Sequence, residues 1–512
     1  MIATKFAQIS DPLVLPEVAW SAMTPLLILI VGALGLLVIT ALTPKKLPVG
    51  FFTLSTVAIA SSAAAVAFSS WDRVTDPDQG PYTAIAGAIT VDGFSVLLST
   101  LLATIVVLVA LLADGYLRRE NTHAPEFYVL VLLSASGGVM MALANDLIVI
   151  FLGLEVLSIA LYVLAGFQSN RKESQESALK YFLLGAFASA FLLYGIALIY
   201  GATGSTNLGE INGFLARNLA VDEGLLLGGL VMLIVGLGFK VGVVPFHNWV
   251  PDVYQGAPTP VTALMASSVK VAGFAALLRV IVSALQVQAQ DWRPAIWAIA
   301  ILTLVVGPVM AIVQSDVKRM LAYSSISHAG FILIGLQASS DRGTAGAVFY
   351  LVSYSFMALG AFGVVSLVSK QGDMGVSIEQ FKGLSKRRPG LALAFTVFLL
   401  GQTGVPLTSG FMAKFSVIGA AVSSRSYALA MVAMLTSVIG AFAYLRVIVA
   451  MYLGDEDDQL SEISRFERPR IPAAAGIALG ISLAVTIGVG VLPSYVLDAA
   501  DDAVPVMITP SR

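Results

Sequence analysis

Four ionisable side chains stand inside long apolar runs. Glu155 lies in Phe-Leu-Gly-Leu-Glu-Val-Leu-Ser, and Lys240, Lys270 and Lys414 lie in three further runs. A charge at the centre of a bilayer costs about 2.5–3.5 kcal/mol on insertion scales, so such groups face a partner or a wet cavity. One carboxylate cannot neutralise three lysines, and burial disfavours a charged amine. We therefore expect proton transfer: Glu155 near Lys240 keeps that lysine charged, and separating them releases its proton.

Each of these residues also has a plainer interpretation. A glutamate and a lysine in a membrane also form purely structural ion pairs, and Lys270 and Lys414 also fit structural donors to backbone carbonyls. Lys180, a few residues from the end of its run, fits either a proton relay or a side chain that snorkels to the surface. His247 and His328 fit either a proton path or a buried histidine that is simply hydrogen-bonded.

Other charged residues near the ends of apolar runs are expected to be structural. Arg279 and Arg446 come late in their runs, where they either snorkel or clamp a boundary between structural units. Asp316, Lys318 and Arg319 begin another run and predict a solvated helix cap.

The composition indicates which solvent surrounds these residues. Of 512 residues, 57% are hydrophobic and 12% are charged, and the mean hydropathy is +0.88. A soluble fold could not hide that much apolar surface, so the bilayer is the expected solvent. A net charge of −2 gives no basic patch for nucleic acid. With no cysteine and three histidines, we expect no disulfide, no cysteine-ligated cluster and no metal or haem site in this chain.

Fourteen apolar segments can position the charged residues, and each is long enough to cross a bilayer as a helix. The segments are 21–43, 48–69, 93–113, 125–144, 146–167, 177–201, 224–244, 258–285, 293–314, 317–337, 343–369, 389–420, 425–453 and 471–493. The first begins near Ser21 after a mixed stretch, which predicts a span and not a signal peptide. Seven Lys and Arg residues fall in one set of alternate loops and sixteen in the other, which holds Lys45, Lys46, Arg118, Arg119, Arg171, Lys172, Lys318, Arg319, Lys370, Lys382, Lys386, Arg387, Arg388, Arg465, Arg468 and Arg470. The larger set is expected in the cytoplasm, with both termini outside.

An internal repeat is also visible. Leu-Arg-Val-Ile-Val occurs at 278–282 and at 445–449, and upstream of each copy a glycine-rich stretch leads to Pro245 or Pro406. Five segments separate the copies, so the second must be inverted, as in secondary transporters. Each proline predicts a broken helix, with an ordinary proline kink as the plainer alternative. We therefore divide the chain into helices 1–3 (1–124), a first five-helix repeat (125–285), a second, inverted repeat (293–453), and a last helix with its tail (454–512).

The region around the first proline is similar to a known family. Pro251-Asp-Val-Tyr-Gln-Gly-Ala-Pro-Thr-Pro260 resembles the antiporter-like membrane subunits of respiratory complex I, the NADH–quinone oxidoreductase. Within that family this sequence resembles most the N-type subunits. Glu176-Ser-Ala-Leu-Lys180 and Asp316-Val-Lys-Arg-Met-Leu-Ala-Tyr-Ser-Ser-Ile-Ser-His328 support the resemblance, which covers segments five to twelve.

The resemblance implies roles for the four buried charges. Glu155 matches the family's fifth-helix glutamate, and Lys240, Lys270 and Lys414 match lysines of helices seven, eight and twelve. In the family they form a proton channel along the membrane midplane, driven by quinone reduction elsewhere in the complex. A lysine at 414 fits the N type, because the related M type has a glutamate there.

The resemblance also implies partners and location. We expect a multi-pass protein of the bacterial inner membrane that packs against the M-type antiporter-like subunit and small hydrophobic subunits. NADH, FMN, iron–sulfur clusters and quinone are expected in partner subunits, with no cofactor in this chain. Three alternatives stay open: a subunit of a multi-subunit Na⁺/H⁺ antiporter, a non-pumping scaffold, and a photosynthetic relative that uses plastoquinone.

Overall fold

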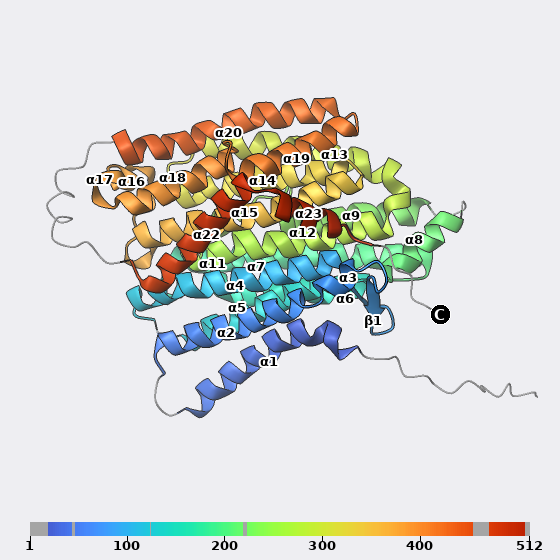
Figure 1. Ribbon diagram of the computed structural model, residues 1–512, viewed down its shortest axis with the longest axis horizontal. Helices are drawn as coiled ribbons and strands as arrows, with labels where there is room; N and C mark the ends of the chain where they lie inside the picture. Colours follow the sequence, from blue (N-terminus) through green and yellow to red (C-terminus); the bar gives the residue numbers. More distant parts are fainter. Residues whose placement is uncertain (1–18, 44–46, 123, 219–222, 454–470, 507–512) are drawn as a thin grey trace, which may run out of the picture.

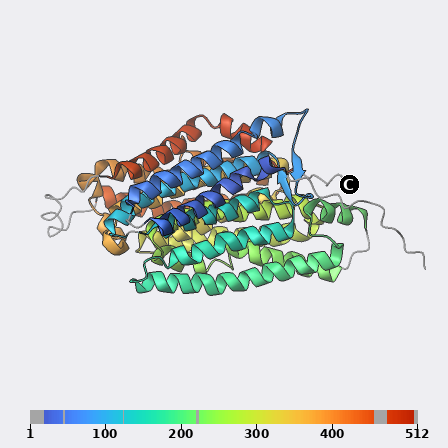
Figure 2. The same cartoon turned by 90° about the horizontal axis from the view of Figure 1, so that it is seen from below.

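The computed structural model describes residues 19–43, 47–122, 124–218, 223–453 and 471–506. Within them the chain is a bundle of long helices that run roughly along the long axis of the molecule (Figures 1 and 2). Helices are expected because a bilayer offers no partners to free backbone groups. Thirteen described helices are long and apolar enough to cross a membrane. This confirms a polytopic all-α fold.

The first half of the chain contains seven long helices, several short ones and a small hairpin. Their bounds are α1 (Trp20–Leu42), α2 (Val49–Phe68), α3 (Trp71–Thr75), β1 (Tyr82–Ala84), β2 (Ile89–Val91), α4 (Gly93–Arg119), α5 (Pro125–Leu143), α6 (Leu147–Ala165), α7 (Lys172–Thr203), α8 (Leu208–Arg217), α9 (Glu223–Val241), α10 (Trp249–Gly256), α11 (Thr259–Leu264), the π-helix η1 (Met265–Val269), α12 (Lys270–Leu278), the π-helix η2 (Arg279–Ala284) and the 3₁₀-helix η3 (Gln286–Gln288). The hairpin is antiparallel, with Tyr82 opposite Val91.

The second half continues the bundle. Its elements are α13 (Ala289–Ile312), α14 (Val317–Gln337), α15 (Asp341–Val368), the 3₁₀-helix η4 (Gln371–Asp373), α16 (Ile378–Phe381), α17 (Leu384–Arg387), α18 (Pro389–Thr403), α19 (Ser409–Ser423), α20 (Tyr427–Leu453), α22 (Ala473–Val491) and α23 (Ser494–Asp502). The predicted segment 389–420 is therefore two shorter apolar helices, α18 and α19. The expectations for the start of the chain, for Lys45, Lys46 and for Arg465, Arg468 and Arg470 lie outside the described residues.

The core of the bundle lies along α11, α12, α14 and α15. These helices are buried along nearly their whole length, whereas α1 and α20 expose most of theirs. Figure 1 shows α1 and α20 at opposite edges, with the buried helices between them. The helices that carry Lys270 and His328 are thus shielded from lipid on all sides.

Both predicted helix breaks are confirmed. α9 ends at Val241, and the chain is not helical again until α10 begins at Trp249. α18 ends at Thr403, and α19 begins at Ser409. Gly242 (φ +72°) and Gly404 (φ +90°) directly follow the two ended helices in the left-handed conformation, which terminates helices and favours glycine. A left-handed glycine thus ends the helix at both of the breaks that the repeat pattern relates to each other. The inverted repeat itself stays a prediction.

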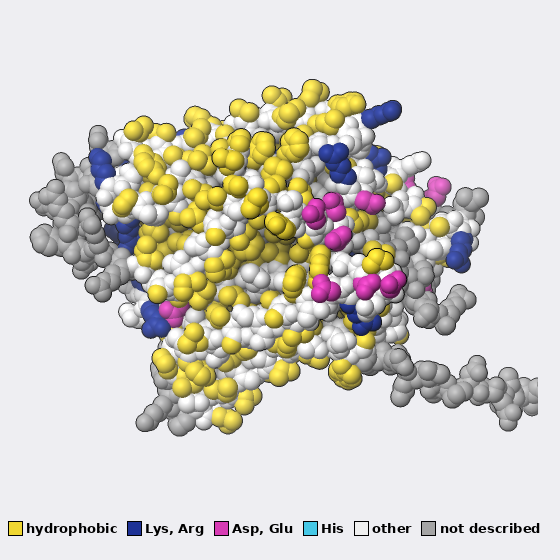
Figure 3. Space-filling model, viewed as in Figure 1, with side chains coloured by type: hydrophobic (Ala, Val, Ile, Leu, Met, Phe, Trp, Pro, Cys, Tyr) yellow, Lys and Arg dark blue, Asp and Glu magenta, His cyan; other side chains and the backbone are white. Residues whose placement is uncertain are grey.

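The surface has the band pattern of a membrane protein. Hydrophobic side chains cover the middle of the face seen in Figure 3, and charged side chains lie towards the two ends of the long axis. Arg119, Arg171 and Lys318, all members of the predicted cytoplasmic set, meet at one end, where each approaches Asp373. We call this the basic end of the bundle.

Candidate functional site: a row of buried lysines

Lys240 is buried in the last turn of α9. The residue is only 3% exposed, and its side chain lies among polar groups inside the bundle. Its Nζ donates to Ser158 Oγ of α6 at 2.8 Å and to Tyr181 OH of α7 at 3.2 Å. The Tyr181 ring also stacks on Trp249, which starts α10. Three helices and the segment after the break therefore hold this amine in place.

Glu155 lies one turn before Ser158 on α6 and is half-buried. Its carboxylate acts electrostatically on Lys240, yet the two groups form no ion pair within 4.0 Å in the described part of the chain. Oε1 is buried and has no hydrogen-bond partner there. In this conformation Glu155 and Lys240 are therefore near each other but not in contact, and the Lys240 amine donates to the Ser158 hydroxyl instead.

A small cavity adjoins Lys240. Ser158, Tyr162 and Ser189 line it together with the lysine, and its volume is about 10 Å³. That volume is at the lower limit for one water molecule, and the lining hydroxyls could hold it. The site therefore has room for a proton carrier beside the amine.

Lys270 opens α12, directly after the π-helix η1, and is 3% exposed. Its Nζ donates to the Val241 carbonyl, at the end of α9, at 3.0 Å. A Cβ added at Gly273 would lie 2.8 Å from Val241 Cγ1 and 3.5 Å from Lys240 Cγ. The close approach of α12 to α9 at this glycine brings the two lysine-bearing turns together.

Lys414 has the same arrangement at the second break. It lies on α19, and its Nζ donates to the Thr403 carbonyl at 2.7 Å and to Ser437 Oγ of α20 at 2.8 Å. Nζ also lies 4.7 Å from the centre of the Phe331 ring, close enough for a cation–π contact. The lysine thus caps the last residue of α18.

Lys270 and Lys414 therefore share one geometry. Each donates to the carbonyl at the C-terminal end of a broken helix, where free carbonyls carry partial negative charge. This is the carbonyl-donor arrangement that was the plainer interpretation of both residues. It does not exclude proton transfer, because a neutral amine can still donate to the carbonyl, only more weakly than the charged ammonium group does.

His328 lies beside Lys414 and within electrostatic range of Lys270. It is buried on α14, and both Lys270 and Lys414 act on it electrostatically. Nδ1 is 2.7 Å from Tyr350 OH, and Nε2 is 3.4 Å from Tyr444 OH. His328 and Lys414 also line a common cavity of about 10 Å³. The structure therefore brings His328 into the row of lysines, and its ring is hydrogen-bonded as well.

His247 and Lys180 are not brought into the row by any hydrogen bond of the described residues. His247 is half-buried in the first break, and its Nδ1 has no partner there. Lys180 is 41% exposed and pairs with Glu176 at 2.6 Å and Asp252 at 2.7 Å. Burial disfavours the Asp252 carboxylate, but hydrogen bonds from Lys180 and Arg319 outweigh it and hold the pKa of Asp252 below its usual range.

One sequence prediction about a cap is wrong in part. Asp316 does cap α14, since its side chain accepts from the Arg319 amide, but Lys318 is not solvated. Its side chain is 0% exposed and meets Asp373, a residue that the sequence analysis did not single out. Asp373 follows α15 in an ordinary polar loop, so nothing local marks it as buried.

The two late arginines clamp their surroundings. Arg279 is 1% exposed, which excludes snorkelling, and forms a two-pronged ion pair with Asp92. Arg446 donates to the carbonyls of Ile312 and Gln314 at the end of α13. Among the described residues there is no cluster of three or more His, Cys, Asp or Glu that could hold a metal ion.

Gly404 offers a direct test of the Lys414 geometry. Its φ is +90°, and an added Cβ would lie 2.9 Å from Lys414 Cδ. We expect Gly404→Ala to destabilise the fold by about 1–2 kcal/mol, because an L-residue is strained there, and to displace Lys414 from the Thr403 carbonyl. Proton pumping by the complex should fall several-fold. Gly390→Ala is the matched control, because no atom lies within 4 Å of its added Cβ; equal pumping in both variants would contradict the geometry.

Comparisons with known proteins place this fold and site in a family. The family described as "NADH:quinone oxidoreductase/Mrp antiporter, TM" matches residues 144–440. NADH-quinone oxidoreductase subunit N of Trichlorobacter lovleyi is 38% identical over 503 residues, which cover 98% of this chain and 99% of the relative.

Solved structures agree. A chain of respiratory complex I from Thermus thermophilus is 34% identical, with a TM-score of 0.78 over 93% of this chain and 99% of that one. A chain of the Mrp complex from a Dietzia species, 21% identical, has a TM-score of 0.81 over 95% of this chain and 97% of that one, and shows the same fold. The chain therefore belongs to the subunit N family of NADH-quinone oxidoreductase, among the antiporter-like membrane subunits of respiratory complex I.

Proposed function

We propose that this chain moves protons across the membrane for its complex along Glu155, Lys240, Lys270, His328 and Lys414. The observation that carries the proposal is the continuity of the row. Lys270 donates to the Val241 carbonyl, next to Lys240, and His328 lines one cavity with Lys414 and lies within electrostatic range of Lys270. These amines have no carboxylate within 4.0 Å among the described residues. Burying such a group costs free energy, which favours a functional reason for its presence.

The helix breaks give the row a way to respond to movement. An ammonium group is held at the end of α9 by the Val241 carbonyl and at the end of α18 by the Thr403 carbonyl. If the end of α9 or α18 moves away from its lysine, the amine loses the partial negative charge of the carbonyl, which favours the protonated form. The proton can then pass to a water molecule or to the next basic group. Glu155 sets the first step, because its charge favours protonated Lys240 when the two approach.

The energy for this movement belongs to the assembly. The chain is a subunit of a proton-translocating NADH-quinone oxidoreductase. In the proposal, partner subunits hold NADH, FMN, the iron–sulfur clusters and the quinone, and this chain contributes only the proton path. Its neighbours are an M-type antiporter-like subunit and small hydrophobic subunits. The basic end faces the cytoplasm of a bacterium, and both termini lie on the outer side.

The rival function is that of a multi-subunit Na⁺/H⁺ antiporter. It shares this fold, as the Mrp chain illustrates, but curated relatives at 38% and 47% identity are named as subunit N of NADH-quinone oxidoreductase. Gentle detergent extraction separates the two. We expect flavin and iron–sulfur proteins to remain bound to this chain, whereas their absence with antiporter subunits present would favour the rival.

Glu155→Gln tests the proton path itself. The substitution keeps the size of the side chain and removes its charge, so Lys240 loses the group that favours its protonated form. In membrane vesicles with the assembled complex, we expect NADH-driven proton uptake to fall by about tenfold or more. Complete removal of a proton-transfer group has an effect of about 10²-fold or more. Glu126→Gln, on an exposed residue at the start of α5, is the control. Normal proton stoichiometry in Glu155→Gln would contradict the proposal.

A further inference from the structure

The chain has another buried break, between α10 and α11. α10 ends at Gly256 and α11 begins at Thr259, so the carbonyls before the break and the amides after it lack partners within their own helices. Ala257 and Thr259 are both 0% exposed, so water at the surface cannot serve these groups. Buried backbone groups must find other partners.

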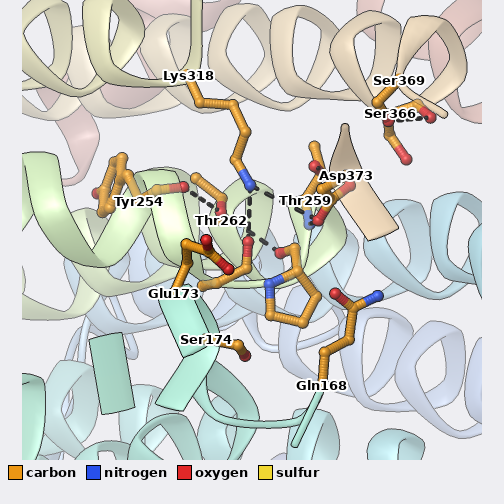
Figure 4. Close-up of polar contacts among 12 residues, drawn as sticks. Gln168, Glu173, Ser174, Tyr254, Thr259, Thr262, Lys318, Ser366, Ser369 and Asp373 are labelled. Carbon is orange, nitrogen blue, oxygen red and sulfur yellow. Dashed lines mark hydrogen bonds and ion pairs between the residues drawn. The ribbon is translucent and has the colours of Figure 1, made fainter. Parts of the chain in front are cut away.

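Charged and polar side chains supply those partners. Lys318 Nζ donates to the Ala257 carbonyl at 2.7 Å. The Thr259 amide and hydroxyl donate to the Asp373 carboxylate at 3.1 and 2.8 Å. Thr262 Oγ1 donates to the Tyr254 carbonyl at 3.0 Å. Figure 4 shows Lys318 reaching down between the break and Asp373, with the Thr259 contacts beside it.

Lys318 and Asp373 are also paired with each other. Their charged atoms are 3.7 Å apart, and their side chains are 0% and 1% exposed. Burial disfavours the Asp373 carboxylate, but the charge of Lys318 and the hydrogen bonds from Thr259 outweigh it and keep the pKa of Asp373 below its usual range. Arg171 at 3.4 Å and Arg119 at 3.8 Å approach the same carboxylate, and Tyr116 OH donates to it at 3.0 Å.

Lys318 and Asp373 come from a different half of the chain than the break that they contact. The break lies in the first predicted repeat, whereas Lys318 on α14 and Asp373 after α15 belong to the second. Lys318 caps the end of α10 just as Lys270 caps α9 and Lys414 caps α18. It differs in having a carboxylate partner, whereas the other two have none within 4.0 Å in the described residues. The ion pair therefore restrains this lysine from a second side, and its cap stays in place unless α14 or the loop after α15 moves.

We propose that Lys318 and Asp373 are positioning residues that latch the Ala257–Thr259 break closed at the basic end of the bundle. Movement of α14 or α15 in the second half separates the pair, frees the break in the first half and lets protons enter towards Lys270. The latch thus makes opening on one half conditional on the state of the other. This inference rests on the proposed proton path, which it supplies with an entry gate.

Backbone hydrogen exchange in the assembled complex tests the latch. We expect the peptide that spans 257–264 to exchange at least about tenfold faster in Lys318→Met and in Asp373→Asn, because the cap and the Thr259 partner are lost. The ratio of protons pumped to NADH oxidised should fall in both, since the gate opens out of step. Lys318→Arg and Asp373→Glu should restore both readouts in part. Lys382→Met, in an exposed pair with Glu379, should change neither.

The double variant Lys318→Met/Asp373→Asn separates a latch from a purely structural ion pair. If the two charges only neutralise each other, removing both restores assembly and pumping together. Under the latch, assembly recovers while exchange at 257–264 stays fast and the pumping ratio stays low. Normal exchange with a normal ratio in the double variant overturns the inference, and so does a double variant that cannot assemble, because the pair is then a folding element.

The same measurements distinguish a failed latch from a failed proton path. Lys240→Ala removes a member of the path and leaves the break untouched, so exchange at 257–264 should stay slow while pumping is lost. Normal pumping in Lys240→Ala defeats the path and with it the purpose of the gate. Slow exchange in Lys318→Met, with pumping lost in Lys240→Ala, defeats the latch alone.

Discussion

Lys240→Ala in the assembled complex should reduce NADH-driven proton uptake on the order of 10²-fold in the route through this chain, the scale expected when a positioned proton-transfer group is removed. The Lys240 amine donates to the Ser158 and Tyr181 hydroxyls, and no other amine of the described residues donates to these two side chains. The alanine leaves a small polar cavity where the carrier stood. Proton uptake in inverted vesicles, divided by the rate of NADH oxidation, measures the effect.

Two controls show whether the amine itself matters. Ser158→Ala removes one acceptor and leaves the lysine, so pumping should fall only a few-fold. Lys180→Met removes an amine that is 41% exposed and paired with surface carboxylates, and should leave the pumping ratio close to normal if that residue only snorkels. A Lys240→Ala complex that assembles and pumps at the normal ratio would refute the proposed path.

The sequence predicts the features that depend on local chemistry. The breaks at Pro245 and Pro406 were predictable because proline removes a backbone donor wherever it occurs. The burial of Lys240, Lys270 and Lys414 followed from the apolar runs around them. Fold class follows in the same way, since long apolar segments have one stable form in lipid.

What the sequence could not predict depends on partners far along the chain. Lys318 was expected to be solvated because it stands at the start of a segment, and its burial comes from Asp373, 55 positions later. The contact between the Ser158 hydroxyl and Lys240 is similar, because a serine in an apolar helix usually only bonds its own backbone, as Ser158 also does at the Leu154 carbonyl. The further break at 257–258 is not predicted, because the apolar segment 258–285 begins at Pro258, and proline is ordinary at the start of a helix.

The lysine caps suggest one rule for the whole bundle. Three broken helices, α9, α10 and α18, end on a carbonyl that a lysine side chain holds. In the proposed mechanism, a lysine with no carboxylate within 4.0 Å among the described residues exchanges its proton, and its cap therefore varies. Where Asp373 stands beside it, the cap is fixed until the helices move. The proposal thus gives the same contact two roles, proton carrier or restraint, and the presence of a carboxylate beside the lysine distinguishes them.

Arg279→Met should be the most destabilising of the substitutions considered. The Arg279 guanidinium contacts both Asp92 oxygens at 2.6 Å, and each side chain is 1% exposed. Asp92 also caps α4 through the Ser95 amide. Removing one partner of a buried pair costs about 3–5 kcal/mol, because it leaves the other charge without compensation. We expect little assembled complex and a strongly lowered thermal transition for what remains.

The double variant Asp92→Asn/Arg279→Met tests the cause of that loss. It removes the uncompensated carboxylate and keeps an oxygen for the cap at Ser95, so assembly should recover in large part, as neutral replacements of buried pairs often do. Lys382→Met breaks an exposed pair with Glu379 and should change stability by less than about 1 kcal/mol. Arg279→Met assembling as well as Lys382→Met would mean that water reaches Asp92 and that this end of the bundle is not sealed. A seal there matters to the proposed function, because a proton row that opens at an unintended point conducts passively and dissipates the gradient it helps to build.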